Sequence, residues 1–237
     1  MMDETLTGLG PSAFYWILFI GIAILSYTVQ ANLNRKFKKY SQVPTRDGSS
    51  GYDVARRMLE QHGIGDVKVT CVEGQLTDHY NPENNTVNLS KDVYYGRSMM
   101  AAAVAAHECG HAVQHAKAYA PVRMRSALVP VVQFSSKVVT WVLLAGILMI
   151  QVFPGLMLAG IALFAMTTLF SFVTLPVEID ASRRALAWLK HTSSNDKETM
   201  AAAQDALKAA AYTYVVAAIS SLGTLIYYIM IYSSRRS

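Results

Sequence analysis

Residues 138–177 read VVTWVLLAGILMIQVFPGLMLAGIALFAMTTLFSFVTLPV, and none of these 40 side chains is charged. A helix needs about 20 mostly apolar residues to cross a bilayer, so this run is long enough for two crossings. Pro154 and Gly155 interrupt helices and lie near its middle. We therefore predict a transmembrane hairpin at 131–175, with helices over 131–153 and 155–175. The alternative, a buried hairpin of a soluble protein, is disfavoured by so long an uncharged run.

Two further uncharged runs, Thr5–Asn34 and Ala209–Ser234, each fit one crossing. They predict transmembrane helices at 12–31 and 212–232. Acidic residues precede the first helix and basic residues follow it, which favours a retained anchor over a cleaved signal peptide. With four crossings, the sequence predicts a mainly α membrane protein.

The basic residues indicate how the chain is oriented. Residues 35–126 carry 13 Lys and Arg side chains, residues 179–208 carry five, and the hairpin turn carries none. Because cytoplasmic loops are enriched in Lys and Arg, both basic segments are predicted to be cytoplasmic. Arg235 and Arg236 then fall on the opposite side, two charges against 18. This describes a multi-pass protein of the cell (inner) membrane, and it explains the net charge of +5 without nucleic-acid binding.

The longest polar stretch, 40–126, has the pattern of a small α+β region. A helix is predicted at 48–62, capped by Ser49 or Ser50 and ended by Gly63. Alternating residues predict short strands at 67–72 and 86–90, with turn residues at 81–85 between them. An alanine-rich helix is predicted from 98 to 118.

That last helix contains His107-Glu108-Cys109-Gly110-His111. Histidines at i and i+4 share one helix face, so both imidazoles can reach one metal ion. This is the HExxH zinc motif, in which the glutamate, here Glu108, is the general base. The alternative is a pair of solvated histidines on a helix face.

The third zinc ligand is predicted from outside the motif. Lys117 stands where one zincin class has its third histidine, and His115 lies about 12 Å along the helix from His107, too far to share an ion. Glu178 is the first charge after the uncharged run, and a two-His, one-Glu site keeps one position open for water. Asp180 is the competing ligand. A first-turn carboxylate after Pro176 is the structural alternative for Glu178.

Four segments carry a family resemblance: GQLTDHYNP (74–82), VNLSKDVYYGRS (87–98), AAHECGHAVQHA (105–116) and PVEIDASRRAL (176–186). They resemble the YugP-type putative neutral zinc metallopeptidases, and at the level of fold the HtpX-type membrane proteases. The latter are gluzincins whose third ligand is the Glu of an E-x-x-A-D motif. Matching that motif implies Glu178 as ligand and leaves Ser182 where the family has Asp. In the family, this Asp would orient a zinc ligand, and Asp180 or Asp205 is predicted to take that role here.

The same resemblance implies how a substrate would bind. Gluzincins add a substrate peptide to the edge strand of a small sheet, which points to 86–90 with Val87 and Leu89 as contacts. A purely structural hairpin is the alternative. His79, Tyr80 and Arg184 are candidates for stabilising the oxyanion, with structural roles as the alternative.

These interpretations combine into one prediction. The predicted fold is mainly α, with four transmembrane helices and a small zincin-like α+β region. The cytoplasmic parts are a catalytic region at 40–126 and a helical segment at 176–211. The chain is predicted to be a zinc endopeptidase with one Zn²⁺, acting on protein or peptide substrates at the bilayer. The alternative is a non-catalytic metal-binding membrane adaptor. The near absence of ionisable residues in the predicted helices disfavours a transporter. The sequence points to no particular oligomer or protein partner.

Overall fold

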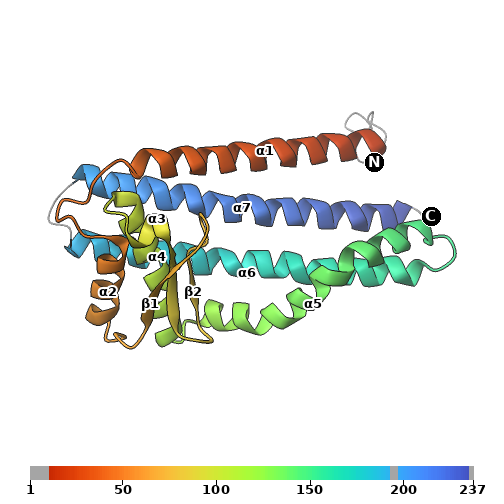
Figure 1. The fold of residues 1–237 in the computed structure, drawn as a ribbon. Coiled ribbons are helices and arrows are strands. Elements are labelled where there is room, and N and C mark those ends of the chain that lie inside the picture. Colours follow the sequence, from red (N-terminus) through yellow and green to blue (C-terminus); the bar gives the residue numbers. More distant parts are fainter. Residues whose placement is uncertain (1–10, 193–196, 235–237) are drawn as a thin grey trace. The chain divides into compact units, whose positions relative to one another are not determined.

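The computed structural model describes residues 11–192 and 197–234, and four long helices dominate it (Figure 1). These are α1 (Pro11–Tyr40), α5 (Ala120–Leu148), α6 (Pro154–Thr192) and α7 (Lys197–Ser234). Each contains a stretch long and apolar enough to cross a membrane. The predicted fold class, a mainly α membrane protein with a small sheet, is confirmed. Arg235 and Arg236 lie outside the described residues.

The hairpin break falls where the sequence predicts it, because α5 ends at Leu148 and α6 begins at Pro154. Proline suits the first position of a helix, where its missing N–H leaves no bond unmade. The helix does not end at residue 175, however. It continues through Pro176 to Thr192. Glu178 therefore lies inside a long helix, and its alternative role as a first-turn carboxylate after Pro176 is wrong.

The chain divides into two compact units. The hydrophobic unit comprises, within the described residues, 11–30, 127–172 and 215–234. Its core includes Leu143 of α5 and Met157 of α6. Small residues allow these two helices to pack closely: a Cβ on Gly146 would lie 2.7 Å from the Met157 Cα, and one on Gly160 would lie 2.7 Å from a Leu143 methyl. This is the small-residue packing expected of membrane helices.

The polar unit, residues 31–126 and 173–214, contains the remaining elements. They are α2 (Gly51–Gln61), β1 (Lys68–Val72), β2 (His79–Asn81), β3 (Thr86–Ser90), α3 (Lys91–Tyr94) and α4 (Met99–Ala116). The sheet order is β1-β3-β2, with β3 parallel to β1 and antiparallel to β2. Asn85, in the turn between β2 and β3, adopts a φ of 54°. The short strand β2 has no counterpart in the sequence prediction.

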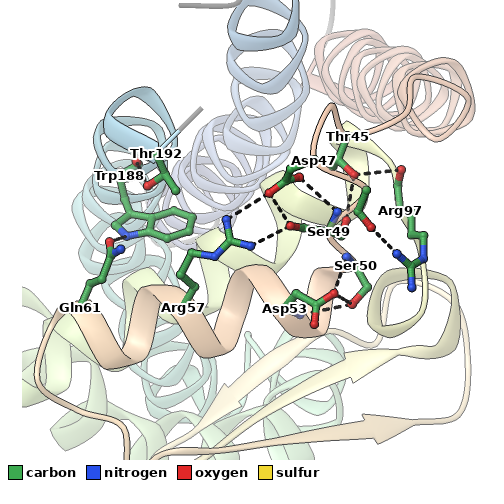
Figure 2. Close-up of polar contacts among 11 residues, drawn as sticks. Thr45, Asp47, Ser49, Ser50, Asp53, Arg57, Gln61, Arg97, Trp188 and Thr192 are labelled. Atoms are coloured by element: carbon green, nitrogen blue, oxygen red, sulfur yellow. Dashed lines mark hydrogen bonds and ion pairs between the residues drawn. The ribbon is translucent and has the colours of Figure 1, made fainter. Parts of the chain in front are cut away.

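Helix α2 is capped as the sequence predicts. Ser50 accepts a hydrogen bond from the Asp53 backbone, and Asp53 accepts one from the Ser50 backbone, which is a capping box. Figure 2 shows this contact beside a second one, in which Arg57 binds Asp47 and Ser49. At the other end of α2, Gln61 accepts a hydrogen bond from the Trp188 indole (Figure 2). These contacts join α2 to the loop before it and to α6.

The core of the polar unit is centred on α4. Ser98 caps this helix, accepting from the Ala101 backbone, and most residues of α4 are buried. α4 contacts α2, α3 and the strands β2 and β3 (Figure 1). Its alanines allow these neighbours to approach closely, and Val87 and Leu89 of β3 fill the space between them with no exposed surface. The HExxH helix is therefore held on several sides.

Candidate metal centre

The two motif histidines lie side by side on one face of α4. The ring centroids of His107 and His111 are 4.8 Å apart, with an interplanar angle of 83°. Both side chains are about 13% exposed. The i, i+4 spacing and the buried helix thus fix two imidazoles in a partly shielded position.

Glycine brings the third residue to them. A Cβ on Gly110 would lie 2.7 Å from the Ala181 backbone oxygen, so α4 and α6 can approach this closely only because Gly110 has no side chain. Glu178 lies on the turn of α6 before Ala181. Its Oε2 is 3.3 Å from His107 Nε2 and 3.6 Å from His111 Nε2.

This geometry suits a zinc ion. Ligand atoms at about 2.0–2.2 Å from a tetrahedral zinc are about 3.4 Å from one another, close to the observed separations. One ligand atom from each of the three residues lies within 4.8 Å of the others. Glu178 Oε2 is buried and has no hydrogen-bond donor among the described residues. A buried carboxylate oxygen without a donor is costly, and a bound cation would remove that cost.

Each histidine is oriented through its other nitrogen. His107 Nδ1 lies 3.1 Å from Ser182 Oγ, and His111 Nδ1 lies 3.0 Å from Gln114 Oε1. The Gln114 amide donates to the Val177 carbonyl and to Asp180 Oδ2, both at 2.8 Å, so its Oε1 is the group that accepts from His111. With both Nδ1 atoms engaged, both Nε2 atoms point toward Glu178 as metal ligands would.

Asp180 acts behind the site. One of its carboxylate oxygens accepts from Gln114 and from Arg184 Nε, the latter at 2.6 Å. Asp180 is therefore linked to His111 only through Gln114. Glu178, and not Asp180, faces the histidines. Of the two ligands that the sequence left open, the structure brings Glu178 to them.

The remaining motif carboxylate, Glu108, is tied to the sheet. It is 8% exposed, and its Oε2 accepts a hydrogen bond from the Tyr80 backbone N–H at 3.1 Å. The outer edge of β2 thus lies against the predicted general base. Cys109, the next residue, is fully buried, and burial raises the pKa of its thiol well above the usual range. A buried neutral thiol is a packing group here.

The surroundings of the histidines favour positive charge. Burial alone would lower the pKa of His111, but the facing carboxylate of Glu178 and the nearby charge of Glu108 outweigh it and raise that pKa above its ordinary value. The same two carboxylates would attract a metal cation.

Comparison with known proteins now gives a family. A family model described as "Putative neutral zinc metallopeptidase" matches residues 15–233. The chain belongs to this family. Its description names zinc and peptide-bond hydrolysis, and the trio of His107, His111 and Glu178 is the group that could hold the metal.

The chain is also similar to the "Putative membrane protease YugP" of Bacillus subtilis (strain 168). It is 40% identical over 224 residues, which cover 93% of this chain and 99% of the relative. No solved structure matches the chain. The predicted resemblance is confirmed over nearly the whole length.

The sheet order corrects the predicted substrate strand and its two predicted contacts. The strand β3 has β1 on one side and β2 on the other, so no peptide can add to it. Val87 and Leu89 are fully buried in the core. Their assignment as substrate contacts is wrong, because the three-residue strand β2 occupies the edge that β3 was expected to form.

The three candidate oxyanion donors also have other partners. His79 contacts the Thr77 carbonyl and Asn88 through its two ring nitrogens, and the Tyr80 hydroxyl donates to Asn85. Arg184 donates to Asp180 and lies over the Tyr119 ring. None of these groups is brought to the His107–His111–Glu178 trio by a described contact. Asp205, suggested as a support for a ligand, instead binds Lys36 and Tyr40.

Three residues at the site were missed from the sequence. Arg125 lies 3.6 Å from Glu178 Oε1, the oxygen that does not face the histidines. Tyr214 of α7 interacts through its phenol with Glu178. Gln114 is the one with a local signal, since it lies three residues after His111 and therefore on the same face of the helix. Arg125 and Tyr214 reach the site only through the tertiary fold.

Proposed function

We propose that the chain is a membrane-embedded zinc endopeptidase that cleaves membrane or membrane-proximal proteins at the cytoplasmic face. The observation that carries this is a single cluster in which two HExxH histidines meet a buried glutamate from another helix. Family membership supports the same reaction class.

One zinc ion per chain would be held by His107 Nε2, His111 Nε2 and Glu178 Oε2. When bound, zinc supplies the Lewis acidity that activates water and polarises the peptide carbonyl. Arg125 would remain paired with the second carboxylate oxygen of Glu178 and keep that side chain turned toward the histidines. Ser182 and Gln114 hold the two rings.

Glu108 is the proposed catalytic residue. Its carboxylate would take the proton from the attacking water and deliver it to the nitrogen of the leaving amine. The Tyr80 N–H on Oε2 leaves the other oxygen, Oε1, to exchange this proton. Tyr214, whose phenol is beside Glu178, is the proposed donor to the oxyanion in place of His79, Tyr80 and Arg184.

The substrate is proposed to be an extended peptide beside β2. This strand pairs with β3 on one side, and its Tyr80 amide points to Glu108 on the other. A chain lying along that outer edge would bring a peptide bond next to the general base. The cytoplasmic location is supported by the Lys and Arg of 35–126 and 179–208, through the bias of cytoplasmic loops. Anchoring by four helices gives access to membrane proteins at high local concentration.

The test uses the full chain, purified and reconstituted in lipid nanodiscs, with an unfolded membrane protein as substrate. Glu108→Gln is expected to cleave at least about 100-fold more slowly than wild type, because it loses the proton acceptor, while its zinc content is unchanged. Glu83→Gln, an exposed glutamate on the turn before β3, is the matched control and should cleave normally. Wild-type cleavage by Glu108→Gln would refute the mechanism. Zinc binding without cleavage by wild type would favour the adaptor.

A further inference from the structure

A groove runs between the second half of α6 and the first half of α7, both within the polar unit. Its volume is about 510 Å³. Apolar side chains form most of its surface, with Leu186 and Met200 on opposite helices and Leu207 beside them. Ile179 lies at one end and is 44% exposed. The groove is therefore an apolar surface open to the exterior.

Cations rim this apolar surface. Arg183, Lys190 and Lys208 line the groove and are exposed, and no Asp or Glu is among the lining residues that the structure describes. On the stretches of α6 and α7 that line the groove, the acidic residues Asp180 and Asp205 bind partners elsewhere. Among the described residues, none of the three cations forms an ion pair, although Lys208 lies over the Tyr212 ring. Three positive charges thus remain available to a partner.

The length of the groove limits what fits. From Ile179 to Lys190 the lining spans 12 residues of α6, a rise of about 16 Å, or three helical turns. A partner helix of similar length places apolar residues at i, i+3, i+4 and i+7 along such a floor. Its flanking positions would meet the cationic rim.

We propose that this groove docks an amphipathic protein segment whose apolar stripe is flanked by Asp or Glu. An apolar floor with a cationic rim is complementary to that pattern. The rim would also repel the Lys- and Arg-rich segments that usually flank membrane helices on the cytoplasmic side. The groove therefore selects acidic partners against the commoner basic ones.

The groove also touches the metal centre. Ser182 lines it, and the same hydroxyl contacts His107 Nδ1. A docked segment would lie one side chain away from a proposed zinc ligand. Docking itself does not depend on the proposed peptidase activity, so it can be measured in the Glu108→Gln protein, in which cleavage of the peptide is expected to be slow.

The experiment uses full-length Glu108→Gln protein in nanodiscs of neutral phosphatidylcholine. The probe is a fluorescein-labelled amphipathic peptide of about four helical turns, with leucine on one stripe and glutamate on its flanks. A second peptide has lysine in place of every glutamate. Fluorescence anisotropy is expected to show at least about tenfold tighter binding of the glutamate peptide, from three exposed charge pairs.

The decisive variant reverses the rim charges: Arg183→Glu, Lys190→Glu and Lys208→Glu together. It is expected to bind the glutamate peptide about tenfold more weakly and to prefer the lysine peptide. The control triple, Lys68→Glu, Lys117→Glu and Arg123→Glu, reverses three exposed cations outside the groove and should bind like the parent. Zinc content reports that each variant is folded.

Three results would overturn the proposal. The first is equal binding of both peptides, and the second is unchanged binding by the rim variant. The third comes from repeating the measurement in nanodiscs that contain anionic phosphatidylglycerol. If the anionic lipid displaces the glutamate peptide from the protein with the unchanged rim, the occupant is a lipid headgroup and not a protein segment.

Discussion

Glycine brings helices together in both units of the chain, but the two contacts do different work. In the hydrophobic unit, Gly160 makes room for the Leu143 side chain. In the polar unit, Gly110 makes room for the backbone of Ala181. The first contact lets two apolar helices pack. The second sets the distance between the histidines of α4 and Glu178 of α6.

The two regions also treat buried polar groups differently. In the hydrophobic unit, Ser135, Thr167 and Ser220 bury hydroxyls that have no partner among the described residues. In the polar unit, Gln114 and Ser182 each bind a specific histidine, and two buried side-chain oxygens, Thr174 Oγ1 and Glu178 Oε2, have no partner among the described residues. An unpartnered buried carboxylate oxygen costs far more than an unpartnered buried hydroxyl, so Glu178 Oε2 is the one of these atoms that indicates a cation site.

The largest expected effect comes from adding one methyl group to each glycine, which tests whether the two contacts differ in their effect on zinc binding. Gly110→Ala is expected to lower zinc affinity by about 100-fold or more, because its Cβ meets a backbone oxygen and displaces Glu178 by a fraction of an ångström. Gly160→Ala crowds Leu143 within the hydrophobic unit, which contains none of the three proposed ligands, so zinc affinity should not change. Competition with a fluorescent zinc chelator measures both.

Gly21→Ala is the matched control, since nothing lies within 4 Å of a Cβ at that helical position. It should bind zinc as wild type does. Equal loss of zinc in the Gly110 and Gly160 variants would show that the close approach of α4 and α6 has no special role in the site.

A second prediction concerns the ring that Gln114 holds. Gln114→Ala removes the acceptor for His111 Nδ1 and leaves the buried Val177 carbonyl without its side-chain donor. Loss of such a support typically costs 10–100-fold in metal affinity, and we expect a loss of about that size. The same chelator competition measures it.

Gln204→Ala is the control, because this glutamine is exposed on α7. If the Gln114 variant kept full zinc affinity while losing thermal stability, Gln114 would serve only to join α4 and α6, and its role in orienting His111 would be wrong.

The smallest expected effect belongs to Ser182. Ser182→Ala should weaken zinc binding only a few-fold, since one neutral hydrogen bond contributes about 1 kcal/mol. Ser182→Asp places a carboxylate beside His107 Nδ1 and is expected to strengthen binding by a similar factor. A weaker Ser182→Asp site would show that the pocket around His107 has no room for the longer acid. Isothermal titration of zinc into chelator-treated protein gives both values.

The sequence predicts the parts of this molecule that depend on local pattern. The uncharged run at 138–177 with its Pro154 break, the Ser50 cap and the HExxH helix each carry their signal within a few turns. The same logic failed at Pro176, because a proline disfavours continuation of a helix locally but does not always end it, and α6 continues through it.

Features that depend on distant segments were not predictable. The position of β3 in the middle of the sheet follows from strand pairing, which alternation within one strand does not determine. Tyr214 and Arg125 approach Glu178 from α7 and α5, and no spacing in the sequence joins them. Glu178 itself was favoured over Asp180 by the family resemblance, while spacing alone left both open.

The central claim is that His107, His111 and Glu178 hold one zinc ion, and elemental analysis of purified protein tests it most directly. Wild type should contain about one zinc per chain, Glu178→Ala should contain little after mild dialysis, and Glu108→Gln should match wild type. The Glu83→Ala protein controls for loss of an exposed carboxylate. Full zinc content in Glu178→Ala, or none in wild type after zinc is added back, would contradict the account.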